Sequence, residues 1–94
     1  MQSVYHFVHL SKSNNVAVAL DNIPKGECIK LNRGTIALKK DIEFGHKFAV
    51  QPIEKGEFIV KYGEVIGKAT SFIKIGEHVH LHNVEGNRGR GDNQ

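Results

Sequence analysis

IPKGECI (residues 23–29), IEKGEFI (53–59) and IKIGEHV (73–79) share the pattern I-x-x-G-E-x-[IV]. In each copy an isoleucine ends one segment, a glycine makes a turn that favours positive φ, and a glutamate opens a strand. The uneven starting positions, 23, 53 and 73, exclude a regular solenoid. The pattern therefore predicts a turn-into-strand device that is used three times within one compact all-β domain.

Short alternating apolar runs between these turns predict many short strands and no helix. Ten glycines and many β-branched residues disfavour helix throughout the chain. Each run is bounded by Gly, Pro or Asn, which is typical of strands joined by turns. The expected strands are Tyr5–Leu10, Val16–Leu20, Glu27–Leu31, Thr35–Leu38, His46–Pro52, Glu57–Lys61, Val65–Ala69 and His78–Asn83.

Composition limits the class of protein. Ninety-four residues suffice for one small domain, and 13 basic residues are interleaved with 10 acidic ones. They form no basic stripe, so we expect no nucleic-acid partner. No apolar run approaches the roughly 20 residues of a membrane span, and the start of the chain lacks a signal-peptide pattern, so we expect a cytoplasmic protein. The single cysteine, Cys28, is expected to be a small core residue.

The third copy continues into GEHVHLHN, where His78, His80 and His82 alternate with Val79 and Leu81. On a strand the histidines share one face, and the two apolar residues face the core. Next-but-one residues lie ~6.7 Å apart, so two adjacent histidines can converge on one metal ion, whereas three on a straight strand cannot. The candidate pairs are His78 with His80, or His80 with His82. A solvated polar strand face explains the same spacing equally well.

Two further sets of polar residues are candidates for ligand binding. His46 and Lys47 follow Gly45 and could contact an anionic substrate, although the residues alone favour a simple turn before a strand. Asn83 could bind a substrate hydroxyl or begin a turn. Residues 85–94 contain no apolar side chain, so we expect the domain to cover residues 1–84 and a flexible Gly/Arg-rich tail to follow. Bidentate contacts to a carboxylate are possible from Arg88 and Arg90.

Several motifs in order carry a family resemblance. They are NVAVALD (15–21), GHK (45–47), IxxGE (53–57), KYG (61–63), IGxAT (66–70), GEHVHxHN (76–83) and RGxGD (88–92). Together they resemble the small N-terminal SAF-type domain of the altronate/galactarate dehydratase family. The resemblance implies a β-clip fold, either fused to a large catalytic domain or encoded as a separate small subunit. Because the chain stops just after RGRGD, it resembles the separate subunit or, as the second alternative, an excised domain.

The resemblance also implies a function. It indicates the small subunit of a lyase that removes water from an aldonate or aldarate to give a 2-keto-3-deoxy acid, inactive without its large subunit and able to form homo-oligomers. A divalent metal, iron or alternatively manganese, would be held mainly by the large subunit. The implied metal ligands are His80 and His82, and His78 is the weakest candidate of the histidines. The implied catalytic residues are His46, Lys47, His80 and His82, and the implied substrate-binding residues are Asn83, Arg88 and Arg90.

Three alternatives remain open. The same family includes the small subunit of a sulfolactate sulfo-lyase, in which bisulfite leaves instead of water. Other SAF-type domains are non-catalytic carbohydrate-binding modules, but these would not require a His-x-His-x-His-Asn strand. A small nucleic-acid-binding β-barrel would suit the basic charge, yet the chain lacks an aromatic series for base stacking.

Overall fold

The chain folds into short antiparallel strands joined by turns. The computed structural model describes residues 5–9, 14–31, 34–61 and 63–86, and none of them lies in a helix. Within this part of the chain, therefore, no helix could cross a membrane. The strands are β1 (Phe7–Val8), β2 (Val16–Ala19), β3 (Cys28–Leu31), β4 (Gly34–Ala37), β5 (Lys47–Ala49), β6 (Phe58–Lys61), β7 (Glu64–Ala69), β8 (His78–Val79) and β9 (Val84–Gly86). The all-β prediction is confirmed.

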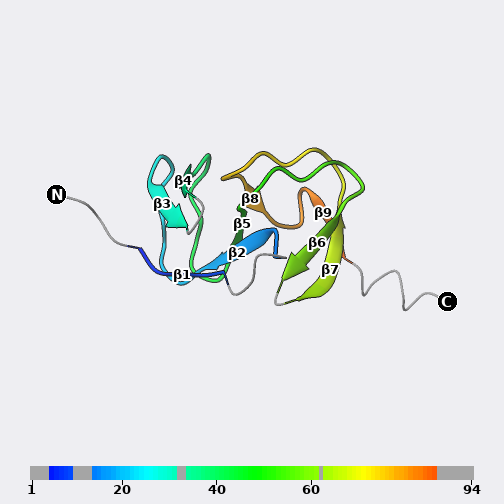
Figure 1. Cartoon of the computed structure of the whole chain (residues 1–94), viewed down its shortest axis with the longest axis horizontal. Coiled ribbons are helices and arrows are strands. Elements are labelled where there is room, and N and C mark those ends of the chain that lie inside the picture. Colours follow the sequence, from blue (N-terminus) through cyan, green and yellow to red (C-terminus); the bar gives the residue numbers. More distant parts are fainter. Residues whose placement is uncertain (1–4, 10–13, 32–33, 62, 87–94) are drawn as a thin grey trace.

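A central sheet separates two smaller ones. The central order is β1-β2-β5-β8, with the β3-β4 hairpin at one end of the molecule and the β6-β7-β9 sheet at the other (Figure 1). Two apolar clusters flank this centre. Phe48 and Ala17 belong to one cluster, while Ala49 and Val16 belong to the other. The central strands are thus buried on both faces, which explains why the VAVA segment of β2 is apolar at every position.

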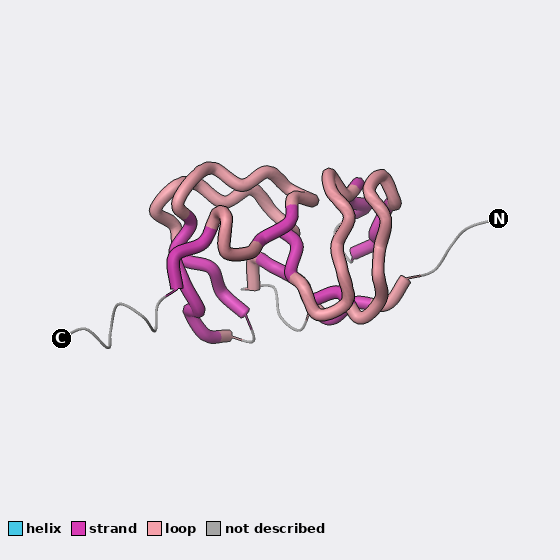
Figure 2. Tube along the Cα trace, turned by 180° about the vertical axis from the view of Figure 1, so that it is seen from behind, coloured by secondary structure: helices cyan, strands magenta, loops and turns pink. Residues whose placement is uncertain are grey.

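Four turns, rather than three, build the frame. The segment 42–48, IEFGHKF, makes the same bridge, turn and strand as the three I-x-x-G-E-x-[IV] copies, with His46 in the place of the glutamate. Figure 2 shows how much of the chain these loop segments occupy between the short strands. The four isoleucines that open the turns pair in two reciprocal bridges, with N–H···O=C distances of 2.8–2.9 Å: Ile23 with Ile42, and Ile53 with Ile73. The pattern I-x-x-G-E-x-[IV] does not include residues 42–48, because His46 follows the glycine there.

Each turn also clasps the chain that leads to its partner isoleucine. One residue of that chain, called here the clasped residue, makes two hydrogen bonds to the turn, at 2.8–3.0 Å. Its carbonyl accepts the N–H of the turn glycine, and its N–H donates to the carbonyl of the residue after that glycine. The clasped residue always precedes the partner isoleucine by four positions. The pairs of glycine and clasped residue are Gly26 with Leu38, Gly45 with Ala19, Gly56 with Ala69 and Gly76 with Ala49. The backbone groups of the turns are thereby satisfied within the domain.

Three expectations need correction. The strand expected over His78–Asn83 ends at Val79, because the chain turns at residues 80–83; Val79 is buried as expected, but Leu81 is 83% exposed. Cys28 is exposed rather than part of the core, since it alternates with the buried Ile29 along β3. The first two residues of the expected tail, 85 and 86, belong to β9 and pair with β7.

Gly76 ties the two ends of the domain together, and its substitution should be costly. Its φ is +85°, and an added Cβ would lie 2.2 Å from the carbonyl oxygen of Ala37 in β4. Gly56 has a similar φ of +91°, but a Cβ there would meet nothing within 4 Å. Positive φ costs an L-residue about 1–2 kcal/mol. We expect Gly56→Ala to lower the free energy of unfolding by about that amount and Gly76→Ala to lower it by at least ~1 kcal/mol more. Urea denaturation measures both, and equal losses would contradict the contact.

A histidine cluster as candidate functional site

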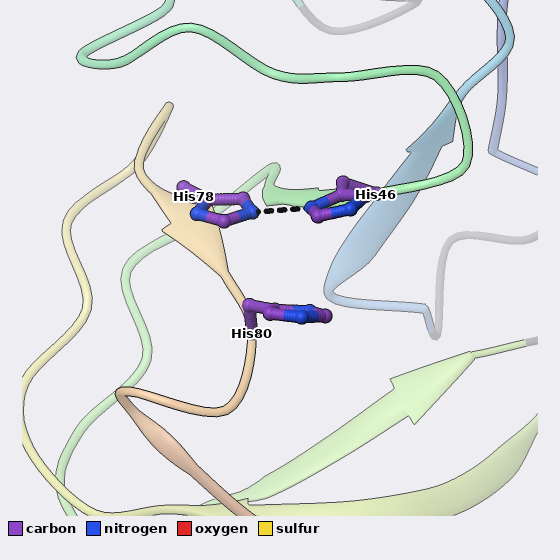
Figure 3. A group of neighbouring side chains, drawn as sticks. All are labelled: His46, His78 and His80. Carbon is purple, nitrogen blue, oxygen red and sulfur yellow. Dashed lines mark hydrogen bonds between the residues drawn. The ribbon is translucent and has the colours of Figure 1, made fainter.

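The pairing of β5 with β8 brings three histidines from two distant segments together. The antiparallel register joins Lys47 to Val79 and Phe48 to His78. Continued by one step, that register sets His46, just before β5, opposite His80, just after β8. Figure 3 shows the rings of His46, His78 and His80 converging from these two segments. The site is therefore built by sheet pairing and not by one strand alone.

The three rings lie close enough to share a ligand. Nδ1 of His46 is 2.9 Å from Nε2 of His78, and the dashed line of Figure 3 marks this contact. The ring centroid of His46 is 4.5 Å from that of His80, and the centroids of His78 and His80 are 5.4 Å apart. One nitrogen of each ring lies within 4.8 Å of the other two. Three imidazole donors this close together could hold a transition-metal ion.

The structure and the sequence spacing group the histidines differently. The spacing leaves two pairs open, His78 with His80 or His80 with His82, and the family resemblance implies the second. The structure gathers His80 with His78 and adds His46. His78, the weakest candidate from sequence, contacts all the other rings, including that of His82 at a centroid distance of 5.3 Å. The difference arises because the chain leaves the strand conformation after Val79, so the alternation of side chains stops there.

Asn83 holds this turn through hydrogen bonds to the backbone. Its side chain is buried, with Nδ2 donating to the carbonyl of His78 at 2.9 Å and Oδ1 accepting the N–H of His80 at 3.0 Å. Its own N–H donates to the carbonyl of His80 at 3.0 Å. These bonds position His78 and His80, while the expected role of Asn83 in substrate binding stays a prediction. Arg88 and Arg90 lie outside the described residues.

Burial and neighbouring positive charges favour the neutral forms of His78 and His80. Burial lowers the pKa of His78 to about 4, helped by the positive charges that the neighbouring histidines and Lys47 would carry. The pKa of His80 is lowered by the same causes, burial first. Burial, together with the charge of Lys61, also lowers the pKa of Lys47. Neutral imidazoles keep a lone pair available, as metal binding and proton acceptance both require.

A small cavity adjoins the cluster. It measures about 190 Å³ and is lined by Lys47, Ile66, His80, Leu81, Val84 and Gly86. Two of the expected site residues, Lys47 and His80, thus border the same hollow. Within the described part of the chain no carboxylate pairs with Lys47, so its ammonium group can attract an anion.

The cluster should make stability depend on pH. Because the pKa of His78 is about 4 in the folded chain and 6.5 in model compounds, the unfolded chain binds more protons between these values. The free energy of unfolding should therefore fall as the pH falls from about 6.5 towards 4. Thermal melts in a chelating buffer measure this fall. We expect His78→Gln to lose less stability over the same window, and an unchanged slope in that variant would contradict the assignment.

These features define a class of small all-β domains that present a histidine cluster at the edge of a central sheet. Residues 5–87 match the family described as altronate/galactarate dehydratase SAF domain, and the chain belongs to this family. The resemblance seen in the sequence motifs is thereby confirmed.

The relatives show how much of a larger protein this domain represents. The chain is 46% identical to an altronate dehydratase of Bacillus subtilis and 40% identical to one of Escherichia coli. Each alignment covers 86% of the present chain. The chain spans only 16% of the length of either relative. It is also 40% identical over 53 residues to the (2R)-sulfolactate sulfo-lyase subunit alpha of Paracoccus pantotrophus, covering 56% of this chain and 79% of that protein.

Proposed function

We propose that this chain is the SAF domain of a sugar-acid hydro-lyase and acts as a small subunit beside a larger catalytic chain. The observation that carries the proposal is the gathering of His46, His78 and His80 beside Lys47 in a member of this family. The identities to altronate dehydratases over most of the chain support an aldonate or aldarate as substrate. The (2R)-sulfolactate sulfo-lyase relatives, which are themselves named subunits, support a larger partner.

The reaction is a β-elimination that removes the proton α to a carboxylate and expels the β-hydroxyl. A divalent metal such as iron or manganese would hold the carboxylate and the hydroxyl and stabilise negative charge. Of these two, the three-imidazole donor set fits iron, because manganese prefers oxygen ligands. Lys47, half-buried at the cavity, would orient the substrate carboxylate. His82 lies outside the group of three and stacks on His78, so it keeps its ring nitrogens for proton transfer.

A sulfo-lyase is the second candidate. The Paracoccus relative is itself named a subunit, and this chain matches 79% of it. Loss of bisulfite from sulfolactate is also a β-elimination next to a carboxylate, so the same groups would serve both reactions. Product analysis separates the two, because one releases sulfite and the other gives a 2-keto-3-deoxy acid.

Reconstitution tests the proposal. The chain is co-expressed with a large altronate dehydratase-type catalytic chain, and turnover of altronate, galactarate and sulfolactate is measured. We expect no turnover by the small chain alone and turnover by the co-purified complex. Lys47→Ala and His82→Ala should each lower kcat at least about tenfold, or ~1.4 kcal/mol in the barrier.

His9 supplies the matched control, because its Nε2 contacts the carbonyl of Asn14 away from the cluster. His9→Ala should keep the activity of the complex. Turnover by the small chain alone, or full activity in both the Lys47 and His82 variants, would overturn the proposed role.

A further inference from the structure

We propose that this chain by itself binds one divalent transition-metal ion through His46, His78 and His80. This inference deepens the proposed function, because it assigns to the small chain a metal that the family resemblance places mainly on the large chain. The role of that metal in catalysis rests on the proposed function. Its physical basis is the geometry of the three side chains, which needs no partner.

The donor atoms are already near a coordinating arrangement. Two ligands at 2.0–2.1 Å from a tetrahedral metal ion stand about 3.3 Å apart. Nδ1 of His46 and Nε2 of His78 are 2.9 Å apart, and a nitrogen of His80 lies within 4.8 Å of both. The rings are stacked with interplanar angles of 14–22°, so metal binding requires them to rotate until all three donors face one ion.

The backbone that carries the donors is held in place. His46 lies in the clasped turn, where the N–H of Ala19 donates to the carbonyl of His46 at 2.8 Å. His78 is paired with Phe48 in the sheet, and Asn83 fixes both His78 and His80. A preformed site loses little conformational entropy when the ion binds.

Glu43 lies on the side of His46 where metal-binding histidines commonly have a carboxylate, although at a distance longer than a hydrogen bond. Its Oε1 lies 3.7 Å from Nε2 of His46, the ring nitrogen that does not face His78. A carboxylate on that side favours the tautomer with hydrogen on Nε2, which leaves Nδ1 free to coordinate.

The frame itself does not require a histidine at position 46. The equivalent Glu57 and Glu77 cap their own turns by accepting the N–H groups of Glu54 and Lys74 at 2.7 Å. The turn of His46 is capped instead by Oδ1 of Asn22, which accepts the N–H of Phe44 at 2.9 Å. With the capping done elsewhere, the imidazole lies against the other histidines, which a turn-stabilising role does not explain.

The donor set selects the class of metal. Three imidazoles suit zinc, cobalt, nickel, copper or ferrous iron, whereas magnesium and calcium prefer oxygen ligands. With three protein ligands, a fourth position remains for water or for an oxygen of the substrate. We therefore expect binding of Co²⁺ and Zn²⁺ and none of Mg²⁺ at equal concentration.

The test uses the chain alone after treatment with a chelator. Co²⁺ and Zn²⁺ are titrated by calorimetry, with Co²⁺ absorption and the melting temperature as further readouts. We expect one equivalent to bind and to raise the melting temperature. Alanine at His46, His78 or His80 should each weaken binding at least tenfold, while His6→Ala, whose ring lies against Asp21, leaves it unchanged.

His82 decides between the two groupings of histidines. If His46, His78 and His80 bind the ion, His82→Ala keeps the metal affinity within about threefold and His46→Ala loses it. If His80 and His82 bind the ion instead, His82→Ala loses the metal affinity and His46→Ala keeps it. Melts of the metal-free variants show that each one is folded. The reverse pattern, or a parent chain that binds neither ion at micromolar concentration, overturns this proposal. An inactive complex whose small chain binds metal as expected would instead count against the proposed function alone.

Discussion

The reciprocal isoleucine bridges are the constraint on which the rest of the domain depends. In each bridge two buried isoleucines exchange both backbone hydrogen bonds, and the turn that follows each one clasps the chain leading to the other. Burying an isoleucine side chain contributes roughly 1.5–3 kcal/mol, which matters in a domain whose core is thin. The same contacts satisfy the turn backbone, which would otherwise be costly to bury. Two such bridged pairs, one in each apolar cluster, account for most of the architecture.

The histidine cluster is a direct extension of this frame. The turn at Gly76 clasps Ala49 at the end of β5, and the clasp runs on without a break into the pairing of β5 with β8. That pairing brings His46 and His78 together, and the buried amide of Asn83 then folds His80 back beside them. A site that depends on backbone pairing in this way is preorganised, because its side chains are carried by segments that cannot move independently.

Gathering several imidazoles and a lysine in one place has an electrostatic cost. Burial lowers the pKa of His78 and of His80 and so favours their neutral forms, in which these two rings add no positive charge beside Lys47. Such a group is better suited to a cation or to proton transfer than to stabilising the fold. The exposed Leu81 and the cavity beside Lys47 lie next to it, which is where a larger chain would need to meet this domain in order to share a substrate.

Local sequence determined the all-β class, the three I-x-x-G-E-x-[IV] turns and the family, because strand alternation, turn glycines and ordered motifs are properties of neighbouring residues. It also marked His46, His80 and His82 as candidates. Only the tertiary structure decided which histidines meet, since their grouping depends on the register of β5 against β8 and on where the strand stops. Local sequence did not reveal the hydrogen bonds of Asn83, because they join it to backbone that is in reach only once the chain has folded. It also did not reveal the turn at Gly45, because that copy has His46 where the pattern requires a glutamate. Local periodicity records which way a side chain points along its own strand, but the partner across the sheet is set by long-range pairing.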